Sequence, residues 1–235
     1  MRLSKMEQSI VELRNLSKIY QQGDIQVKAV DNVSLSITKG NFAALCGPSG
    51  SGKTSILNLI GGLDIATSGE VWLEGISLES LSNAELSEIR KNRIGFVFQS
   101  YNLIPVMTAY ENAAFVLDLQ GVDKSERHDR VMQILADVGL VGLEHRRPDE
   151  MSGGQQQRVA IARAIVTQPA IVLADEPTAN VDSHTAEALL DLMQNLNQQQ
   201  NITFLFSTHD QHVIDRAKRI IQVQDGQISS DEYRV

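Results

Sequence analysis

The chain has 235 residues, of which 42% are hydrophobic, 21% charged and 5% aromatic, the balance of a folded globular protein rather than of a disordered, collagenous or membrane-embedded one. Its 29 acidic and 21 basic side chains give a formal net charge of −8, which disfavours nucleic acid as a partner because phosphate backbones are repelled on average. No stretch approaches the roughly 18 uninterrupted apolar residues of a membrane-spanning helix, and the single cysteine, Cys46, is expected to be a small buried hydrophobe.

The first elements are predicted to be antiparallel strands. Residues 10–20 and 27–37 alternate imperfectly between apolar and polar side chains, as half-buried strands do. Gly23 and Asp24 lie between the two runs and predict the turn that joins them.

Three later runs are short and almost entirely apolar: residues 42–46, 171–174 and 202–206. Each is followed by polar or glycine residues and then by a helical pattern, which is typical of buried parallel strands with helices between them. We therefore expect an α/β fold with a mostly parallel sheet.

The stretch between about residues 81 and 147 has a mostly helical pattern, interrupted by a predicted strand near residues 94–98. Ser82 and Glu85 have the spacing of a capping box at the start of one of its helices. This stretch predicts a helical insertion into the α/β core.

Two features follow in the last quarter of the chain. Asp182 or Ser183 is expected to open an amphipathic helix. Asp225 and Gly226 predict a hairpin, after which residues 229–235 are expected to fray.

The segment Gly47-Pro48-Ser49-Gly50-Ser51-Gly52-Lys53-Thr54 matches the spacing G-x-x-x-x-G-K-[ST] and lies between a buried strand and a helix. Its glycines allow the backbone N–H groups to turn inward and form a nest for phosphate oxygens at the positive end of the helix dipole. Lys53 is expected to reach the outer phosphates, and the Thr54 hydroxyl to be a ligand for Mg²⁺. The alternative, an ordinary Gly/Ser-rich turn, does not require all eight residues in this order and setting.

A carboxylate that completes the magnesium site is expected at the end of another buried strand. The apolar run 171–174 ends in Asp175, which would place this side chain beside the phosphate nest at the carboxyl edge of the sheet. Glu176 follows, and its carboxylate is expected to orient or deprotonate an attacking water, although a solvated turn residue is the alternative. The pair therefore indicates hydrolysis in addition to binding.

A second glycine-rich segment narrows the class of protein: Met151-Ser152-Gly153-Gly154-Gln155-Gln156-Gln157-Arg158. Ser152 is expected to cap a helix that begins at glycine, so that its hydroxyl, the amides and the helix dipole present a second anion site. Two half-sites for one phosphate tail in one chain indicate a dimer. On these residues the sequence resembles the ATP-binding subunit of ATP-binding-cassette (ABC) transporters, from about residue 10 to residue 228.

The resemblance implies the ABC ATPase fold, which is a P-loop NTPase core with a mostly parallel sheet, an N-terminal antiparallel β subdomain and a helical insertion. It implies one domain over residues 1–235, with core parts at about 8–80 and 165–228 and a helical subdomain at about 81–164. It also implies a head-to-tail homodimer, in which Ser152 and the glycines of one copy close over the γ-phosphate that Lys53 of the other copy holds.

Further residues take their roles from the resemblance. Tyr20 resembles the aromatic residue that stacks on adenine, and Gln99 resembles the glutamine that touches Mg²⁺ or water and reports on the membrane partner. Asp182 resembles the loop acid that crosses the dimer, and His209 resembles the switch histidine that faces the γ-phosphate. The residues expected to hold ATP are Tyr20, Gly47, Pro48, Ser49, Gly50, Ser51, Gly52, Lys53, Thr54, Ser55, Gln99, Ser152, Gly153, Gly154, Gln155 and Asp182; those expected to act in catalysis are Glu176, His209 and Lys53; and those expected to hold Mg²⁺ are Thr54, Gln99 and Asp175.

Residues 94–105, together with His145-Arg146-Arg147-Pro148, are most similar to the ATPase subunits of lipoprotein release and macrolide export. That branch implies an ATP hydrolase that drives separate integral membrane permease subunits from the cytoplasmic face of the inner (plasma) membrane, where it is peripheral. An apolar series beside Gln99 is expected to form the groove for a membrane subunit's coupling helix, with core packing as the alternative: Tyr101, Leu103, Ile104, Val106, Met107 and Tyr110.

Two other classes of function share part of this pattern. A soluble ABC-type ATPase of DNA repair or translation would have no membrane partner, but repair members carry long coiled-coil insertions and translation members carry two cassettes in one chain. This chain has one cassette and no heptad run. A small-molecule kinase with the same phosphate nest does not account for residues 152–158.

Overall fold

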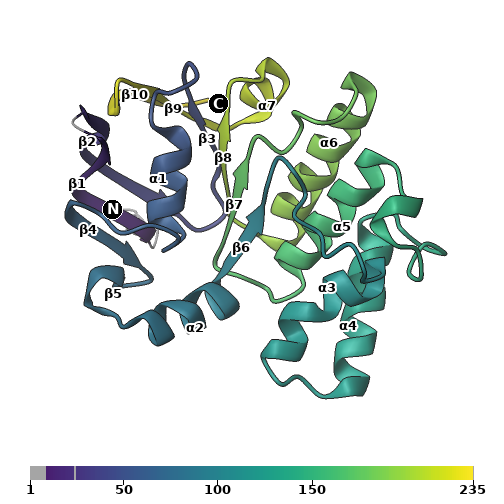
Figure 1. Cartoon of the computed structure of the whole chain (residues 1–235). Coiled ribbons are helices and arrows are strands. Elements are labelled where there is room, and N and C mark those ends of the chain that lie inside the picture. The colour runs from purple at the N-terminus through teal and green to yellow at the C-terminus, as the bar shows by residue number, and fades with distance from the viewer. Residues whose placement is uncertain (1–8, 24, 235) are drawn as a thin grey trace, which may run out of the picture.

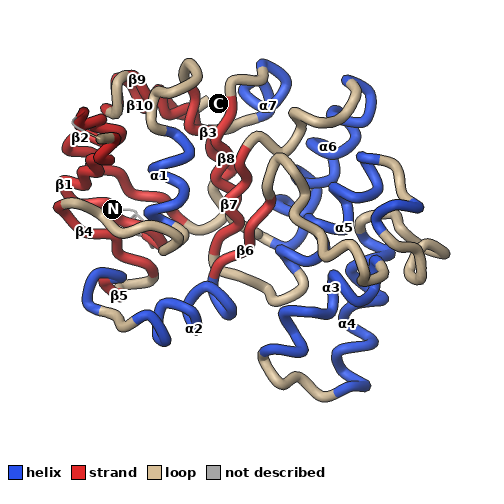
Figure 2. Tube along the Cα trace, viewed as in Figure 1, coloured by secondary structure: helices blue, strands red, loops and turns tan. Residues whose placement is uncertain are grey.

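The computed structural model describes residues 9–23 and 25–234 and contains two sheets with helices around them (Figure 1). The larger sheet has six strands in the order β10-β9-β3-β8-β7-β6, and the smaller has four in the order β2-β1-β4-β5 (Figure 2). The strands of the larger sheet are β3 (Phe42–Cys46), β6 (Ile94–Val97), β7 (Ile171–Asp175), β8 (Phe204–Thr208), β9 (Arg219–Gln224) and β10 (Gln227–Tyr233). Those of the smaller sheet are β1 (Ser9–Gln22), β2 (Ile25–Thr38), β4 (Ser68–Leu73) and β5 (Ile76–Ser77).

The six-stranded sheet is parallel except at one edge. Strand β3 pairs in parallel with β8 and β9, and β7 pairs in parallel with β6 and β8, whereas β10 runs antiparallel to β9. In the register, Cys46 lies opposite Thr208, and Asp175 lies opposite Ser207. The carboxyl ends of three neighbouring strands therefore meet at one edge, where folds of this kind bind their ligands.

Apolar layers cover both faces of this sheet, because successive side chains of a strand point to opposite faces. In β3, Phe42, Ala44 and Cys46 belong to the layer shared with the helices, and Ala43 and Leu45 belong to the layer shared with the smaller sheet. A strand buried on both sides needs no polar alternation, which explains its continuous apolar run. Cys46 is buried, as predicted, and burial raises the pKa of its thiol to about 11.

Helix α1 (Lys53–Ile60) lies between the two sheets (Figure 1). It packs against β2 and β4 of the smaller sheet and against β7 and β8 of the larger one. Ile56, Leu57, Leu59 and Ile60 are buried in the apolar layer between the sheets. This packing fixes the start of the helix at the carboxyl end of β3.

Most of the remaining helices cover the other face of the six-stranded sheet (Figure 1). The bounds are α2 (Asn83–Arg93), α3 (Ala109–Leu119), α4 (Lys124–Asp137), α5 (Gly153–Ile165), α6 (Ser183–Gln200) and α7 (Gln211–Arg216), with 3₁₀ turns at Leu78–Ser80 and Pro148–Glu150. Among the helices that the structure describes, none is long and apolar enough to cross a bilayer.

The predicted caps are confirmed. Ser82 and Glu85 bind each other reciprocally at the start of α2, with the Glu85 amide donating to Ser82 Oγ and the Ser82 amide donating to Glu85 Oε2. Asp182 caps α6 and accepts a hydrogen bond from the Thr185 amide at 3.0 Å. The strand predicted inside the helical stretch is β6, which forms an edge of the six-stranded sheet beside β7.

The end of the chain differs from the expectation. The sequence predicts fraying over residues 229–235, whereas β10 extends to Tyr233, so this prediction is wrong for most of the segment. Arg219 of β9 donates to both carboxylate oxygens of Asp231, at 2.8 and 2.7 Å, and lies over the Tyr233 ring. The polar strand is held by partners on another strand, which its own sequence does not reveal.

The predicted turns lie between the expected strands. Asp225 and Gly226 join β9 to β10, with positive φ values of 49° and 77°. Gly23 follows β1 with a φ of 60°, and Asp24 lies outside the described residues.

Candidate active site

The phosphate-binding loop, residues 47–54, connects β3 to α1. Gly47 and Gly52 have φ values of 154° and 104°, a region that strains any residue with a Cβ atom. An added Cβ at Gly47 would lie 2.1 Å from the carbonyl oxygen of Val223, and one at Gly52 would lie 2.2 Å from that of Ala29. The loop therefore packs its backbone against β9 and β2 so closely that only glycine fits.

Lys53 and Thr54 open helix α1 from within this loop. The side chain of Lys53 curls back, and its Nζ atom donates to the carbonyl oxygens of Gly47 and Pro48 at 2.8 and 2.9 Å. The Thr54 hydroxyl donates to Asp175 Oδ1 at 3.1 Å. The structure thus brings the hydroxyl of the loop to the carboxylate at the end of β7, as the sequence predicts.

Glu176 has a left-handed backbone conformation, with a φ of 44°, which costs a non-glycine residue about 1–2 kcal/mol. Its side chain accepts hydrogen bonds from Thr208 Oγ1 at 3.2 Å and from His209 Nδ1 at 2.6 Å. Because an ionised carboxylate can only accept, Nδ1 carries the proton of this pair. The Glu176 side chain is 15% exposed and that of His209 is 71% exposed, so the carboxylate is shielded beneath the imidazole.

These groups line one cavity of about 600 Å³ at the carboxyl edge of the sheet. The predicted residues in its wall are Pro48, Ser49, Gly50, Ser51, Gly52, Lys53, Thr54, Ser55, Gln99, Asp175, Glu176 and His209. Gln99 arrives from the end of β6, and the others come from the loop, β7 and β8. The volume is that of an ordinary small-ligand site.

Tyr20 lies beside the cavity, where it is in hydrogen-bonding contact with Ser55 of the cavity wall. Its hydroxyl donates to Asp64 Oδ2 at 2.7 Å, and Lys18 Nζ binds Asp64 Oδ1 at 2.6 Å while lying 4.9 Å from the centroid of the Tyr20 ring. Burial raises the pKa of Tyr20, and the hydrogen bonds from Lys18 and Tyr20 outweigh burial and lower the pKa of Asp64. The orientation of the ring is therefore fixed.

The signature segment, residues 152–155, starts helix α5. The Gln155 amide donates to Ser152 Oγ at 3.3 Å, and the Ser152 amide donates to Gln155 Oε1 at 2.9 Å, a reciprocal capping box. Ser152 is exposed, and the described residues that line the 600 Å³ cavity include none of the segment. The start of helix α5 is therefore separate from the described wall of the cavity that holds the phosphate-binding loop.

The two glycines of the signature segment leave room for side chains of neighbouring segments. An added Cβ at Gly153 would lie 2.8 Å from the Tyr101 hydroxyl, and one at Gly154 would lie 2.4 Å from Thr185 Cγ2. Close packing of α5 against α6 and against the loop after β6 thus accounts for both. The sequence explains these glycines by an anion site, which stays a prediction, and the structure adds that they also pack against neighbouring side chains.

Asp182, the remaining predicted site residue, also lies outside the cavity wall. Besides the Thr185 amide, its carboxylate accepts the Thr185 hydroxyl at 2.6 Å, and these hydrogen bonds lower the pKa of Asp182. The carboxylate is ionised at neutral pH and is held in place by α6.

The oxygen atoms at the end of β7 suit Mg²⁺. The Thr54 hydroxyl and the Asp175 carboxylate are in hydrogen-bond contact, and the Gln99 side chain lines the same cavity. Within residues 9–23 and 25–234, no group of three or more His, Cys, Asp or Glu side chains is arranged to hold a metal. Since Mg²⁺ is usually bound by one or two carboxylates together with substrate phosphates, these residues fit an ion that binds with a nucleotide.

Sequence reasoning missed two supporting residues. Asp64 positions Tyr20 from 44 positions away, and no local pattern marks it as a partner. Thr208 binds Glu176 and did carry a signal, because it ends a buried strand directly before His209 at the same edge of the sheet.

A family model described as ABC transporter matches residues 30–179, which hold the phosphate-binding loop, the signature segment and the Asp175-Glu176 pair. The chain belongs to the ABC transporter family. It is an ATP-binding cassette, and the resemblance seen in its sequence is confirmed.

Two relatives differ in the share of their own length that the cassette covers. It is 42% identical over 226 residues to the macrolide export ATP-binding/permease protein MacB of Mannheimia succiniciproducens, covering 96% of this chain and 35% of that one. The cassette therefore spans about a third of the MacB length. It is also 42% identical over 230 residues to the uncharacterized ABC transporter ATP-binding protein MJ0796 of Methanocaldococcus jannaschii, covering 95% of this chain and 97% of that one.

A solved structure of MJ0796, described as a dimeric post-hydrolysis state bound to ADP and Pi, matches the cassette with a TM-score of 0.87 at 42% identity, covering 95% of this chain and 98% of that one. A second dimeric MJ0796 structure matches with a TM-score of 0.88. The predicted α/β fold of the ABC ATPase type is confirmed, and so, at the level of the family, is the prediction of an ATP hydrolase.

Proposed function

We propose that two copies of the cassette bind head-to-tail around two ATP molecules with Mg²⁺, and that ATP hydrolysis in this dimer drives separate integral membrane subunits of the lipoprotein-release or macrolide-export type. One observation is the main support for the proposed dimer. The cavity wall contains the phosphate-binding loop but no described residue of the signature segment, so one copy can hold a triphosphate but cannot cover it with its own signature segment. The MJ0796 structures, which are described as dimeric and in one case as bound to ADP and Pi, support a dimer.

In each proposed site, Lys53 turns from the loop carbonyls to the outer phosphates, and the Ser152 hydroxyl and α5 amides of the other copy bind the γ-phosphate from outside. Thr54, Gln99 and Asp175 would hold Mg²⁺, which would neutralise part of the phosphate charge.

Glu176 is the proposed general base of this reaction. The His209 Nδ1–H group and the Thr208 hydroxyl each donate to its carboxylate and so orient it toward the cavity. A water between this carboxylate and the γ-phosphate would give a proton to Glu176 as its oxygen attacks phosphorus in line, while the bond from phosphorus to the β–γ bridging oxygen breaks on the opposite side and ADP leaves.

Tyr20 is the proposed adenine contact. Lys18 lies over its ring and Asp64 fixes its hydroxyl, so the base would stack on a ring that is already oriented. Ser55 links Tyr20 to the wall of the phosphate cavity.

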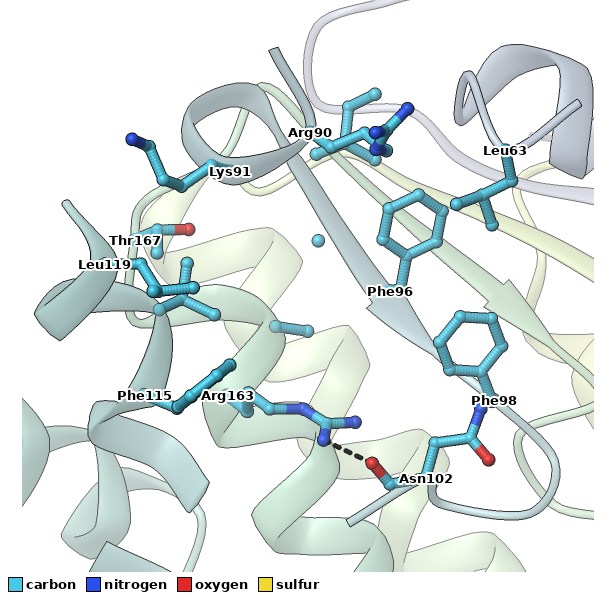
Figure 3. A pocket seen from close by; sticks show the side chains of 14 residues that line it. Leu63, Arg90, Lys91, Phe96, Phe98, Asn102, Phe115, Leu119, Arg163 and Thr167 are labelled. Atoms are coloured by element: carbon cyan, nitrogen blue, oxygen red, sulfur yellow. Dashed lines mark hydrogen bonds between the residues drawn. The ribbon is translucent and has the colours of Figure 1, made fainter. Parts of the chain in front are cut away.

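A second, largely apolar groove of about 370 Å³ is proposed to receive a cytoplasmic helix of the membrane subunit (Figure 3). Phe96, Phe98 and Leu63 lie on one side of it, and Phe115 and Leu119 lie across from them. Leu63 and Leu119 are 48% and 56% exposed, so two of the apolar side chains that line this groove are open to a partner.

The groove differs from the one that the sequence predicts. Its described lining includes Phe98 and Asn102 from the segment around Gln99, but none of the six apolar residues proposed from the sequence. Leu103 and Tyr110 pack against the core instead, and Val106 is 75% exposed elsewhere. For Leu103 and Tyr110, therefore, the alternative of core packing is correct.

The charge at the groove narrows the chemistry of the proposed partner. Arg90 contributes to the lining, and its described hydrogen bonds go to the Gly62 carbonyl and the Ser87 hydroxyl, so its charge has no described carboxylate partner and an apolar helix with an acidic residue is the complement. Such a partner would hold the cassette at the cytoplasmic face of the inner membrane as a peripheral subunit.

The dimer is tested with the Glu176→Gln variant, which keeps ATP from being consumed. Light scattering should give the mass of a dimer with ATP and Mg²⁺ and the mass of a monomer without nucleotide. The same variant carrying Lys53→Ala should stay monomeric with ATP. A Glu176→Gln protein that remains monomeric at saturating ATP would contradict the proposed function.

Docking is tested by co-expression with candidate integral membrane subunits of the lipoprotein-release or macrolide-export type. Leu119→Glu should abolish co-purification from detergent-solubilised membranes, because it places a charge in the apolar groove beside Phe115. Val141→Glu is the matched control, since Val141 is 74% exposed and lies outside the described lining of the groove. Unchanged co-purification of the Leu119 variant would exclude this groove.

A further inference from the structure

The loop after Gln99 contains two consecutive residues in the left-handed conformation. Tyr101 and Asn102 have φ values of 59° and 49°, which side chains with a Cβ atom rarely adopt. Arg163 of α5 holds both peptide units, donating to the Tyr101 carbonyl at 2.9 Å and to the Asn102 carbonyl at 2.6 Å. Figure 3 shows the second of these hydrogen bonds. Two adjacent strained residues persist only where the surroundings fix them, and strain of this kind often marks a functional segment.

Arg163 is committed to this loop. Burial lowers the pKa of its guanidinium, and its described hydrogen bonds go to the two carbonyl oxygens of the loop. The same guanidinium and Asn102 line the apolar groove of Figure 3. The conformation of the loop and the wall of the groove are therefore set by the same contacts.

From this loop, two hydrogen bonds reach the segment between Glu176 and Asp182. The Tyr101 hydroxyl donates to the Asn180 carbonyl at 3.0 Å, and Asn180 Nδ2 donates back to the Gln99 carbonyl at 2.9 Å. These two hydrogen bonds tie Asn180 to Tyr101 and to Gln99, which precede it in the sequence by 79 and 81 positions. The pair connects the loop that supplies Gln99 to the segment that follows the general base.

The Tyr101 hydroxyl also meets the start of the signature helix. A Cβ atom on Gly153 would lie 2.8 Å from this hydroxyl and 3.5 Å from the Asn180 carbonyl. Three segments that the chain brings from different elements therefore meet at one oxygen atom: the loop after β6, the segment before α6, and the first turn of α5.

We propose that Tyr101 is a positioning residue, whose hydroxyl sets the signature segment and the Asn180–Asp182 turn in the relative position that covers the other copy's ATP. The inference rests on the proposed function, because it assumes that these two segments act across the dimer. The inference adds that the signature segment and the Asn180–Asp182 turn, here called the lid, are already assembled within each copy. The loop after β6, which also forms a wall of the apolar groove, holds them.

The Tyr101→Phe variant tests this in the Glu176→Gln background. Phenylalanine keeps the ring, and only the hydroxyl is lost. ATP affinity of the single copy should be unchanged, since the Tyr101 hydroxyl lies outside the described wall of the phosphate cavity. The dissociation constant of the ATP-bound dimer should rise about tenfold, because a symmetric dimer loses one hydrogen bond at each of two lids.

Tyr110→Phe is the matched control. Tyr110 belongs to the same helical region, its ring packs near His128, and no described hydrogen bond of its hydroxyl would be lost. This variant should dimerise with ATP like the parent, and thermal melts should show that both variants fold.

Four outcomes are distinguishable by sedimentation with ATP and Mg²⁺. A weakened dimer with intact ATP binding supports the positioning role. Equal dimerisation of Tyr101→Phe and its parent overturns it, as does a loss of ATP affinity as large as the loss of dimerisation, which would indicate a general folding defect. A parent that never dimerises refutes the proposed function itself, and the inference with it.

Discussion

The phosphate-binding loop and the signature segment both place glycines at the start of a helix, but for different physical reasons. In the loop, Gly47 and Gly52 have positive φ values and their Cα atoms face backbone carbonyls of other strands. In the signature segment, Gly153 and Gly154 are helical and leave room for the side chains of neighbouring residues. The first pair of glycines serves backbone conformation and the second serves packing.

The two segments also differ in what surrounds them. The loop carries Lys53 and lies beside Asp175 and Glu176, so a cation, a candidate metal-binding carboxylate and a candidate base lie in one cavity. The signature segment offers a hydroxyl and helix amides at an exposed position. The loop is a nearly complete site, whereas the signature segment is half of one, and separate substitutions should impair them separately.

The largest effect is expected for Glu176, the proposed general base beside the phosphate-binding loop. Glu176→Gln should lower the rate of ATP turnover about 10²-fold or more, because an amide cannot accept the water proton, while ATP affinity is retained. Phosphate-release kinetics and nucleotide titration measure the two quantities. Glu187→Gln, an exposed position on α6, is the control. Turnover at the unmodified rate would remove Glu176 from the mechanism.

The next effect separates ATP binding by one copy from the covering of that ATP by the signature segment of the other copy. Lys53→Ala should weaken ATP binding to the single copy roughly 30-fold, since a charge-assisted contact to phosphate contributes about 2 kcal/mol. Isothermal titration with ATP and Mg²⁺ measures it. Lys39→Ala removes an exposed lysine outside the cavity wall and should leave the affinity unchanged. Equal affinities for both variants would show that Lys53 does not reach the phosphates.

A packing change should impair the signature segment alone. Gly154→Ala places a methyl group 2.4 Å from Thr185 Cγ2, so α5 must shift away from α6. We expect unchanged ATP binding and a roughly tenfold weaker ATP-dependent dimer of the Glu176→Gln protein, equivalent to about 1.4 kcal/mol.

A second substitution should restore that dimer. Thr185→Ser removes the opposing methyl group and keeps the hydroxyl that binds Asp182 at 2.6 Å. The double variant should therefore dimerise nearly as the parent does in analytical ultracentrifugation. Failure of the rescue would mean that Gly154 acts on the nucleotide directly and not through packing.

The smallest effect is expected for Tyr20, the proposed contact of the adenine ring. Tyr20→Leu should weaken ATP binding about fivefold, since an aromatic stack contributes about 1 kcal/mol, and should leave inorganic tripolyphosphate binding unchanged. Competition titrations with both ligands measure the difference. Equal losses for the two ligands would place Tyr20 in the support of the loop instead of at the adenine.

Much of the site is predictable because each part is local. Residues 47–54 and the pair Asp175-Glu176 follow buried strands, and parallel strands bring their carboxyl ends to one edge. Partners that lie far apart in sequence are not predictable in this way, as Asp64 shows for Tyr20. The docking groove is one example: the sequence predicts it from the apolar residues between positions 101 and 110, whereas the groove that we propose is lined by other residues, around Phe98.

The sequence by itself determined the chemistry of the cassette. The spacing of the glycines, the lysine that follows them and the carboxylates at the ends of strands all lie in short segments, which can be interpreted without knowledge of distant residues. Only the tertiary structure decided which segments face the same cavity. The cavity wall contains the phosphate-binding loop and lacks the signature segment among its described residues, and the Tyr101 hydroxyl joins three segments at one point. Such meetings depend on how helices pack on the sheet, and packing is a property of the whole chain.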